Sequence, residues 1–387
     1  MTLRAEVEIP VGRGGDAPAH DVHAGLHAEG GAFRGEHPGR STDPTVKVVD
    51  LAWLEFEKPD LLRAERFALD FGFQVVDRTP NVLRLRGAWS GCACLVIRKG
   101  RGSRFLGPTF RAESVRDVER LARALGETVV NHAGGRAVET RDPSGFAVRV
   151  VAGLPDLPTL ESRAPLTLNF GADPQRTNAT QRAPHGPAQV QRLGHVVLET
   201  TRFQGALQWY LDHLGMIVSD FLYLDDLRDR GPTMAFIRCD LGSVPSDHHT
   251  LAMHLGPRTG YVHSAYQVGD LDGVALGGRH LAEQGYKQVW GIGRHVQGSQ
   301  IFDYWRDPDR LMFEHFADGD LFDCSLEAGW APMSASGLSQ WGPPVTRDFL
   351  GTSPNPAMVA TVLRALALEQ NEIDPAALRS LMRAMSA

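Results

Sequence analysis

Three side chains that can bind a metal occupy comparable places in strand-like stretches of the sequence. His195 lies in "QRLGHVVLET", His263 in "YVHSAYQV", and Glu314 in the last strand of "IFDYWRDPDRLMFEHF". A carboxylate in a strand built for burial is costly unless it is paired or bound to a cation. Two imidazoles and one carboxylate form the facial triad that suits non-haem Fe(II) and leaves adjacent coordination positions open, and Mn(II) would also fit. The sequence therefore predicts a metal site at these three residues.

An internal repeat supplies a comparison for this site. "TRDPSGFAVRVVAG" (140–153) aligns with "WRDPDRLMFEHFADG" (305–319), and "LAWLE" (51–55) aligns with "HVVLE" (195–199). A single histidine in a strand is more often structural than functional. Here, however, the first copy of the repeat has other residue types where the second has the three candidate ligands, which favours a metal-binding function for them. The aligned residues of the first copy are Leu51, Phe110 and Arg149.

The elements expected to position these residues form four strand–helix–strands units. Two units lie in residues 45–152 and two in residues 188–320, and each has one amphipathic stretch followed by short segments rich in Val, Ile and Leu. This order predicts an α+β protein with curved, partly open sheets in two pseudo-repeated domains. The metal site is expected in the domain at 188–320, and the domain at 45–152 is expected to be metal-free.

Three further segments lie outside the two blocks. Residues 1–44, rich in Gly, Ala and His, predict a flexible N-terminal extension. Residues 153–187, rich in Pro, Asn, Thr and Arg, predict a linker. Residues 321–387 predict a loop-like tail that ends in a helix starting near Pro356. We expect this tail to act as a lid or as a subunit contact.

Composition excludes several classes of function. The 387 residues are 42% hydrophobic with a formal net charge of −6, and the basic residues are scattered, so we expect no nucleic-acid partner. No apolar run approaches the roughly 18 residues that a membrane span needs. The four cysteines fit free thiols in a reducing compartment, and the Cys92–Cys94 pair lacks the second pair of a typical zinc site. We therefore expect a cytoplasmic protein, and we expect it to form a homo-oligomer.

The second block resembles the catalytic half of the type I extradiol dioxygenases, in the vicinal oxygen chelate (glyoxalase–bleomycin resistance) superfamily, and the first block resembles their degenerate half. The matching stretches are "LGHVVLET", "DHHTLAMHLGP", "YVHSAYQV" and "GRHVQGSQIFDYWRDPDRLMFEHF". The resemblance covers about residues 45–320 and implies a fold of tandem βαβββ modules. It also implies meta cleavage of a catecholic substrate, with O2 as co-substrate, at one Fe(II) bound by His195, His263 and Glu314.

The resemblance further implies roles for residues around the metal. His249 matches the histidine that acts as acid and base, and His248 is the alternative if the alignment slips by one residue. His295 and Tyr304 match groups that bind substrate. An imidazole near neutral pH suits proton transfer, and a tyrosine hydroxyl suits a hydrogen bond to a substrate oxygen held as the anion.

Alternatives remain at this point. The same scaffold could support a metal-dependent isomerase or lyase, or a protein that only binds an aromatic ligand. Glu199, four residues after His195, is an alternative ligand, whereas strand alternation turns His315 away from the metal. The substrate could be a hydrophobic catechol, next to Trp290, Ile301, Phe302, Trp305 and Phe313, or a carboxylated one held by Arg258, Arg294 or Arg306.

Overall fold

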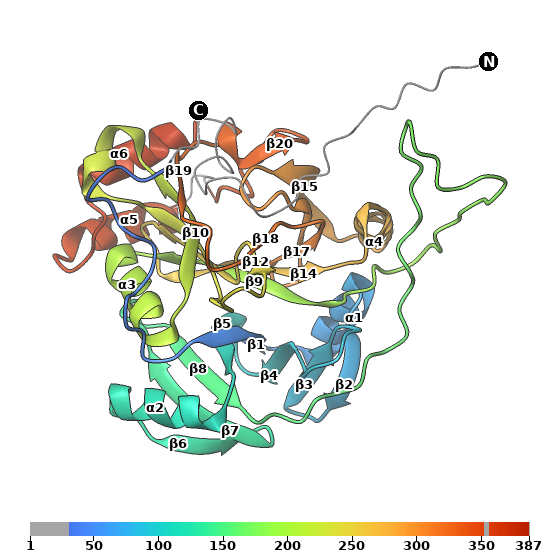
Figure 1. Ribbon diagram of the computed structural model, residues 1–387, viewed down its shortest axis with the longest axis horizontal. Coiled ribbons are helices and arrows are strands. Elements are labelled where there is room, and N and C mark those ends of the chain that lie inside the picture. The colour runs from blue at the N-terminus through green and yellow to red at the C-terminus, as the bar shows by residue number, and fades with distance from the viewer. Residues whose placement is uncertain (1–30, 352–355, 387) are drawn as a thin grey trace.

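The computed structural model describes residues 31–351 and 356–386, which form two sheet-based halves (Figure 1). The first half contains an eight-stranded sheet of order β2-β3-β4-β1-β5-β8-β7-β6. Its helices are α1 (Leu61–Phe71) and α2 (Val115–Leu125). Its strands are β1 (Val48–Lys58), β2 (Gln74–Arg78), β3 (Val82–Arg86), β4 (Leu95–Lys99), β5 (Arg104–Ala112), β6 (Val129–His132), β7 (Gly135–Arg141) and β8 (Ala147–Ala152).

The second half contains a ten-stranded sheet of order β19-β10-β11-β13-β9-β14-β17-β16-β15-β20 and a small β12-β18 pair. Its helices are α3 (Phe203–Leu214) and α4 (Leu271–Glu283), and the chain ends in α5 (Pro356–Ala367) and α6 (Pro375–Ala384). Its first strands are β9 (Arg192–Thr200), β10 (Ile217–Tyr223), β11 (Met234–Arg238), β12 (Ser246–Asp247), β13 (Leu251–Leu255) and β14 (Gly260–Gln267). They are followed by β15 (Lys287–His295), β16 (Ile301–Arg306), β17 (Met312–Ala317), β18 (Leu321–Phe322), β19 (Gly329–Pro332) and β20 (Ser339–Trp341).

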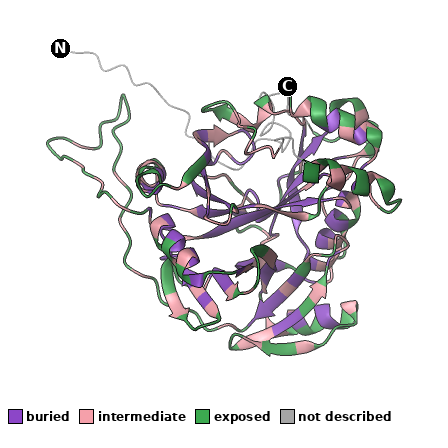
Figure 2. Ribbon diagram, turned by 180° about the vertical axis from the view of Figure 1, so that it is seen from behind, coloured by how far each residue is buried: buried purple, intermediate pink, exposed green. Residues whose placement is uncertain are grey.

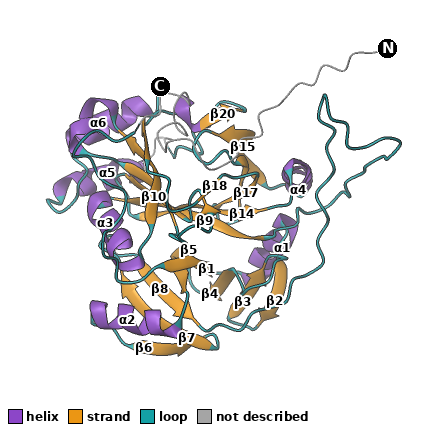
Figure 3. Ribbon diagram, viewed as in Figure 1, coloured by secondary structure: helices purple, strands orange, loops and turns teal. Residues whose placement is uncertain are grey.

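The strand pairings confirm the four predicted strand–helix–strands units. β1 pairs antiparallel with β5 and parallel with β4, and β9 pairs in the same two ways with β14 and β13. β5 and β14 each pair parallel with the last strand of their unit, β8 and β17. Local signals set the helices: the Asp60 side chain accepts from Arg63 N at the start of α1, and Gly72, at φ +112°, ends that helix in the left-handed conformation. Figure 3 shows that helices lie at the outside of the strands.

The R-D-P repeat forms the same turn in both halves. The side chains of Asp142 and Asp307 each accept a hydrogen bond from the backbone N–H four residues later, at 2.9 Å and 2.8 Å. The residue three positions after each aspartate has positive φ, +93° at Gly145 and +70° at Arg310. The shared letters therefore reflect a shared backbone, and Arg149 and Glu314 take equivalent places after it.

The two halves pack through aromatic side chains. Phe56, from the first half, lies 5.2 Å from Tyr261 and 5.9 Å from Phe313 between ring centroids. His315 stacks on Phe71 at 3.8 Å and hydrogen-bonds the Phe71 carbonyl oxygen at 2.7 Å. Figure 2 shows the buried residues concentrated along the strands of both halves. His315 thus belongs to the core between the halves, facing away from Glu314 as expected.

The segments outside the sheets differ in part from expectation. Residues 1–30 of the predicted extension lie outside the described residues. Within the rest of that extension, Glu36 pairs with Arg228 at 2.8 Å and Arg40 donates to the Cys324 carbonyl, so this part packs on the second half. The tail after 321 is not merely loop-like: it adds β18, β19 and β20 before its helices. Within the described residues, no helix is long and apolar enough to cross a membrane.

Candidate metal centre and active site

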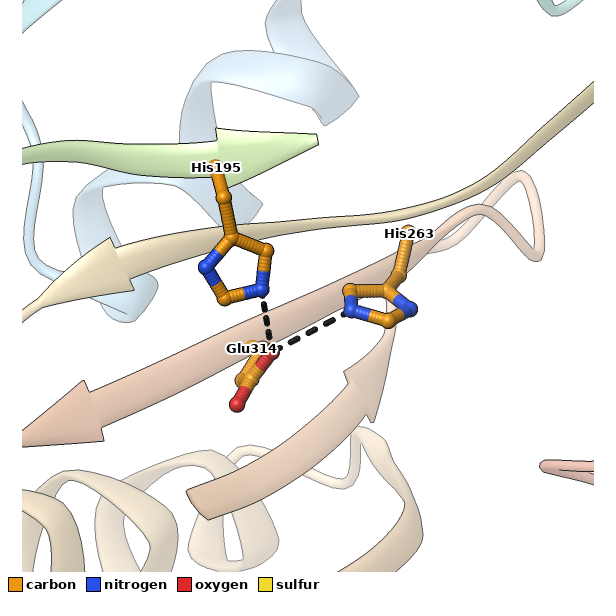
Figure 4. Close-up of side chains that lie close together, drawn as sticks. All are labelled: His195, His263 and Glu314. Carbon is orange, nitrogen blue, oxygen red and sulfur yellow. Dashed lines mark ion pairs between the residues drawn. The ribbon is translucent and has the colours of Figure 1, made fainter. Parts of the chain in front are cut away.

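The three candidate ligands meet on adjacent strands at the centre of the ten-stranded sheet. His195 comes from β9, His263 from β14 and Glu314 from β17, which are neighbours in that order. Nε2 of His195 and Nε2 of His263 both lie 3.3 Å from Oε2 of Glu314 (Figure 4). Their potential ligand atoms all lie within 4.8 Å of one another. Residues 68 and 51 positions apart along the chain are thus brought to one point by strand pairing.

The geometry and burial of this cluster fit a metal ion. Two ligand atoms about 2.1 Å from one ion, at about a right angle, would lie about 3 Å apart, close to the observed spacing. Glu314 is fully buried, and both of its carboxylate oxygens lack a hydrogen-bond partner within the described residues. Its neighbours within ion-pair distance there are all histidines. A buried carboxylate without donors needs a cation.

Burial and charge shift the pKa values of these groups. Burial alone would raise the pKa of Glu314, but the contacts and charges of His195 and His263 outweigh it and hold that pKa well below its usual range. Burial lowers the pKa of the His263 imidazole, although Glu314 acts in the opposite direction. At neutral pH an ionised carboxylate and a neutral imidazole are the forms that bind metals.

Of the two adjacent histidines, His249 lies beside the candidate metal ligands. Its ring centroid is 3.9 Å from that of His195, and its side chain is buried. Burial, followed by the charges of the neighbouring histidines, lowers the pKa of His249 well below its ordinary value. His248 instead directs Nε2 to Asp220 at 2.5 Å. His249 is therefore the one of the two that lies next to the candidate metal ligands, where an acid–base group could reach a substrate. His248 lies between His249 and Asp220.

Tyr304 and His295 form a second group at the site. Tyr304 is the register partner of Glu314, and its ring lies 5.1 Å from that of His263. Its hydroxyl lies 2.8 Å from Nε2 of His295, while Nδ1 of His295 lies 2.8 Å from the Leu338 carbonyl oxygen. A carbonyl only accepts, so His295 donates from Nδ1, and Nε2 of the neutral ring accepts from Tyr304.

The pKa shifts agree with that assignment of protons. Burial lowers the pKa of His295 to about 4, which keeps the ring neutral at pH 7. Burial, with the nearby charge of Glu314, raises the pKa of Tyr304 well above its ordinary value. Tyr304 therefore keeps its hydroxyl proton and can donate it in a hydrogen bond.

The alternative ligand and the candidate carboxylate-binding arginines are engaged elsewhere. Glu199 accepts from Arg258 at 2.7 Å and is not part of the metal cluster, so the alternative ligand is not supported. Arg294 pairs with Asp318 at 2.7 Å. The third arginine, Arg306, pairs with Asp348 at 3.0 Å.

Several aromatic and aliphatic residues expected near the site pack into other cores. Trp305 and Phe313 belong to the main hydrophobic core, and Ile301 packs with Val268 and Val274. The expectation is therefore wrong for these three, because strand alternation turns them to the face opposite Tyr304 and Glu314. Trp290 and Phe302 do lie with Tyr304, in a cluster that also contacts Phe349.

The tail after residue 321 contributes to the site in a way that the sequence did not reveal. The Phe349 ring lies 4.8 Å from Tyr304, 4.7 Å from Trp290 and 6.3 Å from His263. The Pro343 carbonyl accepts from Trp290 Nε1 at 2.9 Å. Two of the groups through which the tail contacts the site, the carbonyl oxygens of Leu338 and Pro343, belong to the backbone and cannot be recognised from residue types.

The chain is similar to known proteins over most of its length. The family described as the Glyoxalase/Bleomycin resistance protein/Dioxygenase superfamily matches residues 192–315. Metapyrocatechase 2 of Cupriavidus necator is 32% identical over 330 residues, covering 84% of this chain and 98% of the relative. An iron-dependent extradiol dioxygenase of Rhodococcus jostii is 27% identical, covering 77% and 97%.

Solved structures show the same fold. A Mn(II)-bound glyoxalase from Novosphingobium aromaticivorans superposes with a TM-score of 0.65 at 21% identity, covering 80% of this chain and 95% of that one. The 2,3-dioxygenase LapB from Pseudomonas sp. KL28 gives 0.61 at 17% identity, covering 74% and 98%.

The fold and the relatives thus define a vicinal oxygen chelate protein with a candidate metal centre in its second half. Within that superfamily the chain belongs to the extradiol dioxygenases, which are oxidoreductases that cleave the ring in the meta position.

Proposed function

We propose that His195, His263 and Glu314 hold one Fe(II), at which the enzyme opens the ring of an uncharged catechol with O2. The observation that carries this proposal is the convergence of two imidazole nitrogens on one buried carboxylate oxygen, at 3.3 Å each. Two nitrogen ligands and one oxygen ligand suit Fe(II) and leave positions for substrate and oxygen.

Mn(II) is the alternative metal. The ligand set accepts both ions, and a relative from Geobacillus genomosp. 3 with 23% identity is a manganese-dependent 2,3-dihydroxybiphenyl 1,2-dioxygenase. The relative from Rhodococcus jostii, at 27% identity, is iron-dependent and supports Fe(II).

The chain's own residues handle the protons. When bound, the metal supplies a Lewis acid that two adjacent catechol oxygens can chelate and a centre at which O2 reacts. His249, neutral because burial lowers its pKa, accepts a hydroxyl proton from the substrate and later returns it. Tyr304 turns its hydroxyl proton from His295 to a substrate oxygen and stabilises the anionic form. His295 holds the Tyr304 side chain in place.

The apolar residues around the candidate metal site support an uncharged substrate. Val197, the register partner of His263, packs in a cluster with Phe236, and Val262 joins that cluster to the one that contains Trp290 and Tyr304. The three arginines that could have held a ring carboxylate are paired with carboxylates of the protein. Desolvating a charged substituent here would be costly.

Anaerobic reconstitution tests the function. The purified protein is loaded with Fe(II) or Mn(II), mixed with catechol, 3-methylcatechol, 2,3-dihydroxybiphenyl or a carboxylated catechol, and then exposed to air. We expect oxygen uptake with a yellow ring-fission product, greater activity with Fe(II), and kcat/KM about tenfold or more higher for the uncharged substrates. Tight binding of catechol without oxygen uptake would indicate a ligand-binding protein, and a product formed without oxygen would indicate an isomerase or lyase.

A further inference from the structure

A chain of buried hydrogen bonds runs from Asp220 through His248 to His249. Oδ2 of Asp220 lies 2.5 Å from Nε2 of His248, and Nδ1 of His248 lies 2.9 Å from Nδ1 of His249. All three side chains are at most 5% exposed. The His249 ring in turn lies 3.9 Å from the ring of the metal ligand His195. The network therefore extends from the core to the edge of the metal centre.

The surrounding structure fixes the position of His248. Its backbone N–H donates to the Asp320 carbonyl at 2.9 Å, and its own carbonyl accepts from the Ser219 hydroxyl at 2.5 Å. The rings of Phe236 and Phe322 lie 5.5 Å and 5.4 Å from its ring. Gly298, at φ +80°, packs against the His248 ring without a side chain. A Cβ at this position would lie only 2.9 Å from Nδ1 of His248 and would displace the ring. The ring of His248 is held on several sides.

The polarity of these hydrogen bonds follows from the chemistry of the groups. A carboxylate can only accept, so Asp220 accepts from the Nε2–H of His248. If His248 is neutral, its ring has one N–H, which is donated to Asp220, and Nδ1 of His248 accepts. The donor to it is the Nδ1–H of His249. Nε2, on the opposite edge of the His249 ring, is left with its lone pair.

We propose that Asp220 and His248 are positioning residues that hold His249 in the Nδ1–H tautomer, with Nε2 free to accept the proton of the substrate. This inference rests on the proposed function, in which His249 exchanges that proton. A buried Asp–His pair could also serve folding alone, because buried polar groups need partners. A purely structural pair would affect stability and iron content, but it would not control the tautomer of His249 or act selectively on kcat.

The first measurement does not depend on activity. Long-range ¹H–¹⁵N correlation spectra of the ¹⁵N-histidine-labelled, metal-free protein report which ring nitrogen carries the proton, and the signals of His249 are those lost in His249→Gln. We expect the Nδ1–H tautomer in the wild type and its loss in His248→Phe, which removes the acceptor while keeping an aromatic ring between Phe236 and Phe322. A wild-type His249 protonated at Nε2 would overturn the inference, whatever the activity of the enzyme.

The second measurement uses the Fe(II)-loaded enzyme. We expect Asp220→Asn and His248→Phe each to lower kcat per bound iron about tenfold to a hundredfold, with KM for the catechol changed less than about threefold. Since the two residues act through one group, the double variant should be no more than about twofold worse than His248→Phe. A kcat per iron equal to that of the wild type, or losses that multiply, would contradict the proposal.

A matched control comes from the first half. Asp142 is also a buried aspartate, 4% exposed, that accepts a hydrogen bond from a ring side chain, Tyr210. Asp142→Asn should leave kcat, KM and the His249 spectrum unchanged, which separates the effect of this network from that of removing any buried carboxylate. Failure of the proposed function itself is recognised separately, because the wild type would then take up no oxygen with any catechol.

Discussion

The guanidinium of Arg149 lies 3.0 Å from the carboxylate of Glu55, in the half of the protein that lacks the candidate metal ligands. Arg149 follows the R-D-P turn of β8 as Glu314 follows that of β17. Glu55 also accepts from Arg98, so its charge is balanced by protein cations. Glu314 has no such partner among the described residues and faces two histidines instead. The two copies of the repeat thus place buried glutamates in different surroundings: Glu55 is paired with arginines, whereas Glu314 belongs to a candidate metal site.

Replacing Glu314 should strongly weaken iron retention. In Glu314→Gln the neutral amide is a poor metal ligand, so we expect iron content after gel filtration to fall about tenfold or more, as measured by a colorimetric iron assay. Glu199→Gln is the control, because Glu199 is the other buried glutamate of β9, β14 and β17 and pairs with Arg258. Full iron content in Glu314→Gln, or equal loss in both variants, would show that Glu314 is not a ligand.

The three candidate ligands were predictable from the sequence because their residue types differ from those at the aligned positions of the first copy of the repeat. The place of these three residues in the fold followed from the periodic pattern of the four units. The contacts of the tail were not predictable, since Leu338 and Pro343 act through backbone carbonyls that any residue could supply. Asp220 was also missed: it looks like an ordinary polar residue of a strand, and its partner His248 lies 28 positions away. Only strand pairing and tertiary packing bring such residues together.

Tyr304→Phe should slow the reaction without releasing the metal. The variant keeps the ring packed against His263 and Phe349 but loses the hydroxyl hydrogen bond. A hydrogen bond to a charged group contributes about 1.5–3 kcal/mol, so we expect kcat to fall about tenfold to a hundredfold at unchanged iron content. Steady-state oxygen uptake measures this. Tyr210→Phe, in α3, is the control, and a similar loss of kcat there would mean that the effect is a general one.

Phe349→Ala should weaken the use of substituted catechols. This tail residue covers Tyr304 and Trp290, so its removal takes apolar surface from the site and loosens the tail. Burial of a phenylalanine side chain contributes about 1.5–3 kcal/mol, and for a partly buried one we expect kcat/KM for 3-methylcatechol to fall about five- to twentyfold. Trp341→Ala is the control within the same tail, because Trp341 is 47% exposed and should change kcat/KM less than about twofold. Equal effects of the two substitutions on kcat/KM would show that Phe349 has no specific role in binding the substrate.

Asp142→Asn should stabilise the protein at alkaline pH. Burial raises the pKa of Asp142 to about 6 from 3.8, although hydrogen bonds from the Phe146 backbone and Tyr210 act against it. The wild-type carboxyl therefore contributes most stability when protonated, below about pH 4, and loses that contribution as the pH rises through about 6. Asparagine does not titrate, keeps an oxygen that accepts from the Phe146 N–H, and can donate to the Tyr210 hydroxyl.

Each pKa unit corresponds to about 1.4 kcal/mol, so we expect the Asp142→Asn variant to be about 1–3 kcal/mol more stable than the wild type at pH 8, and this advantage to shrink towards pH 4.5. Urea unfolding of both proteins at the two pH values measures the difference, and an advantage that does not depend on pH would mean that Asp142 has the same pKa in the folded and unfolded states.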